Sequence, residues 1–471
     1  MKRKNLKTYV LIGLILSSVI LTGKIWFNEK LWPEGYNFFA VITDKFSFGK
    51  DNFISSLTKE TISFPKNIVI NNLEKRSIYT ADSEIFSNIS PDVRELLRLA
   101  LEKSETSSAT EEAWASALQT RSMHIVYPVA YDSKLFLNIL GSYQTGERSI
   151  PVREFIITAD EPAEDKVSVY IKNHSTDEIL KAQISWDKAR FDKIIDTYAT
   201  DSIGNLSYSS ELNFDKAGDG DEKQKVIIES NVLIQLNKKL NHMIREINPL
   251  YEYDFNSEVV ESILKSFGHN VSGTRKYVEH DNSVVYVENY STLKFHPNGL
   301  LEYSAVDDTK GIDVGSNSGF YESLLGCVDF VNLLWGDVFP HVPLNINISS
   351  DIVDIKSNSF KLTMDYFADG AEVNISIPQG ASHPPVNNGV EIQVSNGRIV
   401  SYRQVMAFFE SAEASTDSVS AIDALDKLIG GGNMVGKVVR DLYPTYISHD
   451  TGLRKSAWAV RTSDNQVSII D

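Results

Sequence analysis

The 471-residue sequence predicts an α+β fold, with one N-terminal transmembrane helix followed by a multidomain ectodomain of antiparallel sheets with packed helices. Four observations support this prediction. A long apolar run follows a basic N-terminus, and amphipathic helical patterns recur along the chain. Asn-Gly pairs at 298–299 and 396–397 separate strand-like runs, which is the strongest short signal for a hairpin. With 42% hydrophobic and 10% aromatic residues, the composition is sufficient for packed cores.

The apolar run at residues 9–27, YVLIGLILSSVILTGKIWF, is predicted to span a membrane. Basic residues dominate the tip at residues 1–8, which the positive-inside rule places in the cytoplasm. Trp26 and Trp32 follow, as expected at a membrane interface. No small-residue cleavage pattern follows the run, so an uncleaved anchor is favoured over a signal peptide. The expected location is therefore the cell membrane, single-pass, with the C-terminal bulk extracytoplasmic and the lipid bilayer as one partner.

The charge outside the anchor is strongly acidic. Residues 1–27 contain five Lys or Arg and no acid, which leaves 41 basic against 63 acidic residues, or a net charge of −22, in the remainder. Such a charge repels nucleic acid and other anionic polymers, so we expect no nucleic-acid partner. A solvated surface is the simplest interpretation, and a protein partner is the alternative.

Beyond the anchor, we expect a juxtamembrane segment and then three α+β domains. The segment covers residues 28–65, and the domains cover residues 66–247, 248–317 and 318–471. Two Asn-Gly hairpins, each with a neighbouring helix, are weak evidence that the later domains are related.

The first domain is expected to mix helices and strands. NISPDVRELLRLALEK predicts a helix capped by Ser90, with Pro91 in its first turn, and a short helix is expected around Trp114. MHIVYPVAYDSKLFLNIL and REFIITADEPAEDKVSVYIKN are predicted largely as strands, because they are rich in β-branched and aromatic residues between turn signals. VIIESNVLIQLNKKLNHMIREI is predicted as a helix that closes the domain.

The second domain is predicted to begin with a helix in EVVESILKSF that ends at Gly268, followed by strands on either side of the first Asn-Gly turn. VDDTKGIDVGSNSG is expected to be a linker. The third domain starts with a helix containing Cys327, whose apolar neighbours recur at helical spacing. As the lone cysteine, it excludes an intramolecular disulfide and is expected to be a buried structural thiol. Hairpins are expected at FADGAEV and IQVSNGRIVSY.

The stretch LIGGGNMVGKVVRD comes within one residue of a nucleotide-binding P-loop, from Gly431 to Gly436 and Lys437. A P-loop follows a strand and opens a helix, whereas SAIDALDKLI before the glycines is a predicted helix with a capping box at Ser420. Val438 stands where a magnesium-binding Ser or Thr is required. The glycines are therefore predicted to cap a helix rather than to bind phosphate.

No other motif indicates catalysis or metal binding. The nine histidines never come within ten residues of one another, which excludes the helical zinc-hydrolase motif. EHDN around His280 is expected to be a turn between two strands. We therefore assign no catalytic, cofactor-binding or metal residue and expect no cofactor. Spacing does not exclude a catalytic group assembled from distant residues.

The predicted transmembrane helix carries the candidate partner-contact residues. Gly13 and Ser17 are four residues apart, as are Ser18 and Thr22. Small residues at this spacing let two helices approach closely and form interhelical hydrogen bonds. The alternative is that they have no special role, since small residues are common in any membrane-spanning helix.

The basic tip, the anchor ending GKIWFNEKLWP, the hairpin YSTLKFHPNGLLEYS and the tail LYPTYISHDTGLRKSAWAVRTSDNQVSIID resemble the YycH/YycI family, and the chain length is that of its YycH branch. The family consists of membrane-anchored accessory regulators of the WalK (YycG) sensor histidine kinase of low-GC Gram-positive bacteria. The resemblance implies a multidomain α+β ectodomain without enzymatic activity. It also implies that membrane helices contact a WalK-type kinase and a YycI-like companion, adjusting a kinase that controls cell-wall metabolism.

Three functional hypotheses follow from the sequence. The first is a non-catalytic regulator that biases a two-component sensor kinase through helix–helix contact in the membrane. The second is an anchored extracellular binding module for cell-wall fragments or peptides. The third is an anchored hydrolase whose His, Asp and Ser residues converge only in the folded protein.

Overall fold

In the computed structural model, all described residues belong to the unit Ser55–Asp471. The described residues are 62, 64–80, 83–103, 105–142, 149–159, 165–201, 205–212, 227–236, 238–250, 258–288, 290–339, 341–380, 383–430, 436–449, 452–464 and 466–471. The tip at residues 1–8 and the predicted transmembrane helix at residues 9–27 lie outside them. Both stay predictions, as does nearly all of the juxtamembrane segment.

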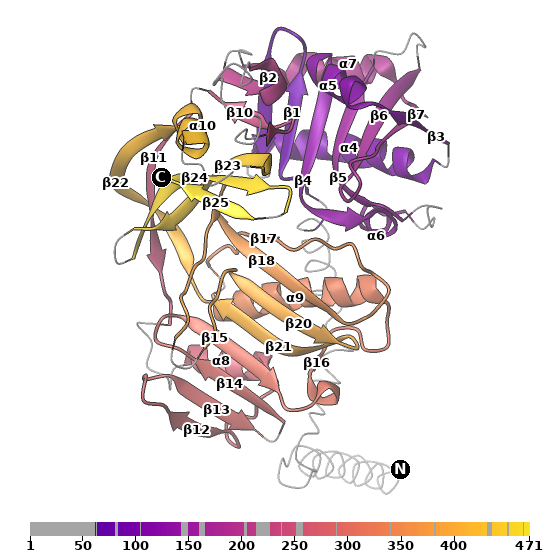
Figure 1. The fold of residues 1–471 in the computed structure, drawn as a ribbon. Helices are drawn as coiled ribbons and strands as arrows, with labels where there is room; N and C mark the ends of the chain where they lie inside the picture. The colour runs from indigo at the N-terminus through magenta and orange to yellow at the C-terminus, as the bar shows by residue number, and fades with distance from the viewer. Residues whose placement is uncertain are drawn as a thin grey trace, which may run out of the picture. The chain divides into compact units, whose positions relative to one another are not determined.

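Two large β-sheets, a two-stranded ribbon and packed helices make up the described part of the chain, which confirms the α+β class (Figure 1). A seven-stranded antiparallel sheet has the order β2-β1-β4-β5-β6-β7-β3. Its strands are β1 (Asn67–Asn71), β2 (Arg76–Thr80), β3 (Thr106–Ala109), β4 (Ser122–Asp132), β5 (Pro151–Thr158), β6 (Lys166–Asn173) and β7 (Ile179–Ser185).

Both faces of this first sheet are covered. The covering elements are α4 (Glu84–Glu102), α5 (Glu111–Gln119), α6 (Ser133–Ile139), α7 (Lys188–Tyr198) and the two-stranded ribbon of β8 (Leu206–Tyr208) and β10 (Leu233–Gln235). Because successive side chains on a strand point to opposite faces, β1 contributes to two cores. Ile68 and Ile70 pack in the main core with Leu97 of α4, whereas Val69 packs in a second core with Trp114 of α5.

The second sheet has 16 strands and includes most of the remaining chain (Figure 1). Its main path runs β12-β13-β14-β15-β21-β20-β18-β19-β23-β24-β11-β22. The strands are β9 (Ile227–Ile228), β11 (Lys239–Ile247), β12 (Arg275–Val278), β13 (Val284–Glu288), β14 (Ser291–Phe295), β15 (Leu300–Ala305), β16 (Ile312–Asp313), β17 (Ile346–Ile348), β18 (Phe360–Ala368), β19 (Ala371–Val373), β20 (Val390–Ser395), β21 (Arg398–Val405), β22 (Phe408–Ser420), β23 (Val438–Ser448), β24 (Leu453–Thr462) and β25 (Val467–Ile470).

Three helices accompany this large sheet, namely α8 (Glu258–Ser266), α9 (Phe320–Val338) and α10 (Ala421–Gly430). α8 and α9 pack against the main path of the sheet. Phe267, just after α8, lies edge-on to Phe330 of α9 at 5.2 Å between ring centroids and 5.4 Å from Tyr402 of β21. α10 packs in a separate core with Trp458 of β24. The helices predicted for EVVESILKSF and around Cys327 are thus confirmed.

Turn chemistry in the large sheet agrees with the sequence. The β20–β21 hairpin turns at Asn396 and Gly397, both with positive φ (+49° and +71°), as a type I′ turn requires. The hairpin at FADGAEV, between β18 and β19, is also confirmed. The β14–β15 hairpin forms as expected but by another route. In this Asn298-Gly299 pair, only Gly299 has a positive φ (+86°). The N–H of Gly299 donates to the carbonyl of His296 at 3.0 Å, so the chain forms a type I turn that ends in a glycine of left-handed conformation.

The prediction of a helix for VIIESNVLIQLNKKLNHMIREI is wrong. This segment forms strands β9, β10 and β11, and β11 pairs antiparallel with β22 on one side and β24 on the other. Met243 and Ile244 are buried between these partner strands. The apolar pattern of the segment fits a helix or a strand, and pairing with its neighbours selects the strand. The expected domain boundary near residue 248 therefore does not separate two sheets, because β11 belongs to the large sheet. The division into three domains stays a prediction.

Two further expectations for the first domain need correction. α4 begins at Glu84, with Ser83 in the cap position, so Pro91 lies inside the helix and Ser90 does not cap it. Phe86 and Ile89 are each only 1% exposed, and their burial extends the helix before the proline. SKLFLNI forms the helix α6 rather than a strand, because the side chain of Asp132 accepts hydrogen bonds from the first backbone N–H groups.

The packing of α9 generates a prediction on its two glycines. A Cβ at Gly326 would lie 2.3 Å from the carbonyl oxygen of Val314, whereas a Cβ at Gly336 meets no atom within 4 Å. We expect Gly326→Ala to lower the free energy of unfolding by about 1–3 kcal/mol through overpacking. Gly336→Ala should raise it by up to about 1 kcal/mol through helix propensity. Urea unfolding of the two variants measures both effects, and equal effects would contradict the close packing.

Candidate functional site

The predicted partner-contact residues, Gly13, Ser17, Ser18 and Thr22, all lie outside the described residues, so their role stays a prediction. Among the residues that the structure describes, no helix is long and apolar enough to cross a membrane.

The P-loop-like glycines follow a helix and precede a strand. α10 ends at Gly430 and β23 begins at Val438, which is the reverse of the order in a nucleotide-binding loop. The capping box of α10 is confirmed, since the hydroxyl of Ser420 accepts from the Asp423 N–H at 3.1 Å. The Asp423 carboxylate accepts in return from the Ser420 N–H at 3.2 Å. Lys437 donates to Gln466, so its ammonium already has a protein partner.

Cys327 on α9 is fully buried, as predicted. Burial raises the pKa of its thiol far above the ordinary value, because the thiolate would lose its solvation. In this position the thiol is a packing group rather than a nucleophile. No group of three or more His, Cys, Asp or Glu residues within the described ranges is arranged to hold a metal ion.

One hydrogen-bonded chain has the connectivity of a catalytic triad. The Ser283 hydroxyl lies 3.1 Å from Nδ1 of His296, and Nε2 of His296 lies 2.7 Å from the Glu302 carboxylate. Ser283 is fully buried and His296 is 2% exposed, so the hydroxyl is not available to a substrate in this arrangement. Glu302 is also bonded to Arg403 at 3.1 Å. These groups satisfy one another beside the β14–β15 turn, which favours a structural role.

A partly buried ionic cluster links the first sheet to the large sheet. We define the Asp441 cluster as Asp441 of β23, Lys66 before β1, Arg153 of β5, and Arg461 of β24. The Asp441 carboxylate lies 2.9 Å from Nζ of Lys66 and 3.2 Å from a guanidinium nitrogen of Arg153. Lys66 and Arg461 lie over the ring of Tyr443 at 3.9 Å and 5.5 Å from its centroid.

The three cations keep Asp441 ionised. Burial alone would raise the pKa of this carboxyl group, but the positive charges of Lys66, Arg153 and Arg461 outweigh burial and lower the pKa to about 2. Burial, with the repulsion of the two arginines, lowers the pKa of Lys66 despite its bond to Asp441. The cluster is a structural ion-pair network, because each member pairs within the protein and none is left for a substrate.

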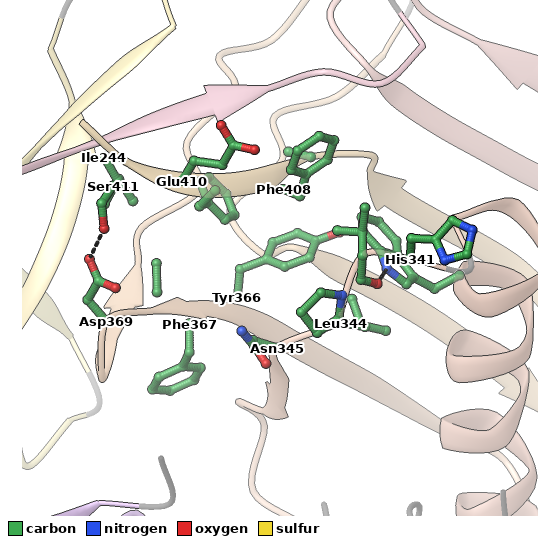
Figure 2. A pocket seen from close by; sticks show the side chains of 16 residues that line it. Ile244, His341, Leu344, Asn345, Tyr366, Phe367, Asp369, Phe408, Glu410 and Ser411 are labelled. Carbon is green, nitrogen blue, oxygen red and sulfur yellow. Dashed lines mark hydrogen bonds between the residues drawn. The ribbon is translucent and has the colours of Figure 1, made fainter. Parts of the chain in front are cut away.

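The pocket singled out in Figure 2 lies between α9, the β18–β19 hairpin and the start of β22. Its volume is about 260 Å³, close to the lower limit for small-molecule sites. Trp335 and Tyr366 form a buried apolar floor together with Ala407. The rim is polar, with exposed residues from the loop before β17 and from the two strand ends.

The charged side chains of the pocket lie at its rim. Figure 2 shows Tyr366 in the middle of the pocket, with Asp369 and Ser411 at one end and His341 at the other. The hydroxyl of Ser411 donates to the Asp369 carboxylate at 3.2 Å. Glu410 precedes Ser411 on β22 and is exposed. This arrangement is suited to binding, because a small apolar cavity with a few polar groups at its mouth orients a ligand.

Sequence reasoning did not find this pocket. Its lining comes from β11, the end of α9 and the following loop, the β18–β19 turn, and the β21–β22 junction. These segments are brought together by strand pairing, and the β11 segment was predicted as a helix. Only the turn at Asp369 carried a local signal, and that signal indicated a hairpin.

Comparison with solved structures then decides the fold. The crystal structure of YycH from Bacillus subtilis matches with a TM-score of 0.55, covering 88% of this chain and 96% of that chain, at 13% sequence identity. The chain has a YycH-like fold. Because the match spans 88% of this chain, the YycH-like fold takes in parts of both sheets. The resemblance predicted from the sequence is confirmed at the level of the fold.

A second solved structure is much less similar. An uncharacterized protein from Eubacterium rectale matches with a TM-score of 0.33 and 10% identity, over 53% of this chain and 87% of that chain. No family model matches the sequence, and no curated protein matches it. The description of this chain as YycH-like therefore depends on its three-dimensional arrangement.

The Asp441 cluster of this YycH-like fold generates a prediction on acid stability. The lowered pKa means that the Asp441 carboxylate stabilises the fold fully above its ordinary pKa of 3.8 and loses this effect as pH falls through about 2. The shift corresponds to a contribution on the order of 2 kcal/mol. We expect Asp441→Asn to lower the free energy of unfolding near pH 7 by about 3 kcal/mol, since buried cations lose their anion.

The measurement is urea unfolding of the full chain between about pH 7 and pH 2. The difference between the two proteins should shrink as the pH falls below about 4, where the Asp441 carboxyl group of the unfolded chain takes up a proton. It should be small near pH 2, where the native carboxylate becomes protonated as well. Asp196→Asn is the control, because Asp196 is 61% exposed in its pair with Arg121 and should contribute little. A constant difference at every pH would contradict the assignment of the charge to Asp441.

Proposed function

We propose that the protein is a non-catalytic, membrane-anchored, extracytoplasmic regulator of a WalK-type sensor histidine kinase that controls cell-wall metabolism. The observation that supports this proposal is the YycH-like fold across 88% of the chain. The resemblance of the tip, anchor and tail to the YycH/YycI family supports the same function. In this proposal the anchor at residues 9–27 places the tip in the cytoplasm, and its partners are the kinase and a YycI-like companion.

The physical mechanism proposed is contact between transmembrane helices. A partner shifts a two-state kinase only by its difference in affinity for the two states. Close helix contacts at small residues contribute about 1 kcal/mol each, and about 1.4 kcal/mol changes an equilibrium tenfold. A few such contacts are therefore sufficient to shift the equilibrium between the two states of the kinase.

The two pairs of small residues are candidates for two separate contacts. In an ideal α-helix, with about 3.6 residues per turn, Gly13 and Ser17 lie on one side and Ser18 and Thr22 on nearly the opposite side. A helix with two such faces is able to contact the kinase and the companion at the same time. This arrangement supports a ternary assembly in the membrane.

The second candidate is an anchored binding module for cell-wall fragments or peptides. The pocket beneath Asp369 favours it, since a preformed cavity of about 260 Å³ is a place for a ligand. The two functions differ in what the anchor does. A regulator that acts through helix contacts needs its own transmembrane sequence, whereas a binding module functions on any anchor.

We expect Gly13→Leu with Ser17→Leu to reduce recovery of the kinase with this protein from membranes at least fivefold, because two close backbone contacts are lost. Ser18→Leu with Thr22→Leu should reduce recovery of the companion instead. Ile12→Leu with Val19→Leu is the control, since both residues stay apolar and lie between the two small-residue faces. Co-purification from detergent extracts measures these effects.

Exchange of the anchor separates the two candidates. Replacement of residues 9–27 by an unrelated spanning helix should abolish the effect on kinase output if the helix contacts carry regulation. Unchanged output after this exchange, with the protein still in the membrane, would overturn the helix mechanism and favour the binding module.

A further inference from the structure

The pocket beside Asp369 is built before any ligand arrives. The indole Nε1 of Trp335 donates to the carbonyl of Val342 at 2.8 Å, which fixes the floor against the loop that lines one wall. The hydroxyl of Tyr366 donates to the carbonyl of Val405 at 2.7 Å and accepts from Gln404 at 3.0 Å. Because both aromatic side chains are held by hydrogen bonds, the cavity does not need to form during binding.

Apart from one histidine, His341, the charged side chains of the pocket are acidic. Its lining includes the carboxylates of Asp369 and Glu410 and no lysine or arginine. The Asp369 carboxylate accepts one hydrogen bond from Ser411 and retains further acceptor positions, since a carboxylate has about four lone-pair sites. The chain as a whole carries −17, which raises the local concentration of cations. A cationic ligand is therefore favoured over a neutral or anionic one.

The pocket also separates polar from apolar contacts. The half-buried side chains of Leu344 and Phe408 offer the apolar surface that a ligand can contact. Trp335 and Tyr366 are each 2% exposed and support this surface from below. The rim offers the two carboxylates, which are exposed. A matching ligand therefore has a hydrophobic body that enters first and a positive group that stays at the mouth. At about 260 Å³, the cavity suits one ring or one branched side chain.

We propose that this pocket binds a primary ammonium group attached to a compact hydrophobic body. The body packs against Leu344 and Phe408, and the ammonium donates to Asp369 and is attracted by Glu410. Two sources share this chemistry, namely a free aromatic or branched-chain amine and the N-terminus of a peptide whose first residue is apolar. This binding does not depend on the kinase function proposed above.

Ligand-observed NMR with the full chain in lipid nanodiscs tests the proposal with matched probes. The free-amine arm uses 2-phenylethylamine, with 2-phenylethanol as its neutral counterpart. The peptide arm uses Phe-Ala-amide, with N-acetyl-Phe-Ala-amide as the counterpart that lacks the charge. We expect saturable binding of at least one amine, with a Kd of about 1 mM or tighter, and at least tenfold weaker binding of each uncharged counterpart. The arm that binds more tightly identifies the source.

Variants assign the binding to this pocket. Asp369→Asn preserves the turn, because Asn tolerates the positive φ of +49° at this position, and it should weaken amine binding about three- to tenfold. Glu410→Gln should weaken it less, and Leu344→Trp should block the body. Glu413→Gln is the control, since Glu413 is exposed on the same strand β22 but does not line the pocket.

Three results would overturn the proposal. These are no saturable binding in either arm, equal binding of an amine and its uncharged counterpart, and unchanged binding by the Asp369 and Leu344 variants. Circular dichroism of each variant confirms that it is folded. A failure of this test leaves the association with a kinase unaffected, because that association is measured separately through the anchor.

Discussion

The ion pairs of the Asp441 carboxylate connect the two sheets directly. This carboxylate pairs with Lys66, 375 positions away in the sequence, and with Arg153, 288 positions away. Apolar packing also crosses this junction, since one continuous core includes residues of both sheets. Apolar contact tolerates small shifts, whereas a buried carboxylate with two bonded cations has one geometry of low energy. The cluster therefore contributes specificity to a junction that packing alone would leave less defined.

The sequence predicted correctly those turns and helix caps whose structure depends on a few neighbouring residues. Asn396 and Gly397 adopt the positive φ angles of their turn whatever lies around them, and the capping box of Ser420 closes on its own helix. The segment of β11 was mistaken for a helix because its apolar residues are compatible with either period. Its two partner strands lie far along the chain and decide the outcome. Similarly, the burial of Phe86 extends α4 past the cap that the sequence indicated.

The pocket could not be predicted from the sequence for the same reason. Its acid and its floor are supplied by segments that are distant in sequence, so no spacing rule connects Asp369 with Trp335. What the sequence did establish was the absence of familiar catalytic spacing. The net charge of −17 also indicated an acidic surface, but not that two carboxylates border an apolar cavity.

The first residues that the structure describes lie at this junction. Ile62 is 1% exposed and its carbonyl accepts from the hydroxyl of Tyr131, Phe64 contacts Phe86 edge-on at 5.4 Å, and Lys66 bonds to Asp441. Residues 62–66 are therefore held by both sheets. A change at the junction of the sheets would displace these residues. Under the proposed function, a ligand on the large sheet would affect the kinase only if it altered that junction. A ligand that binds two conformations of the protein with equal affinity does not shift the equilibrium between them.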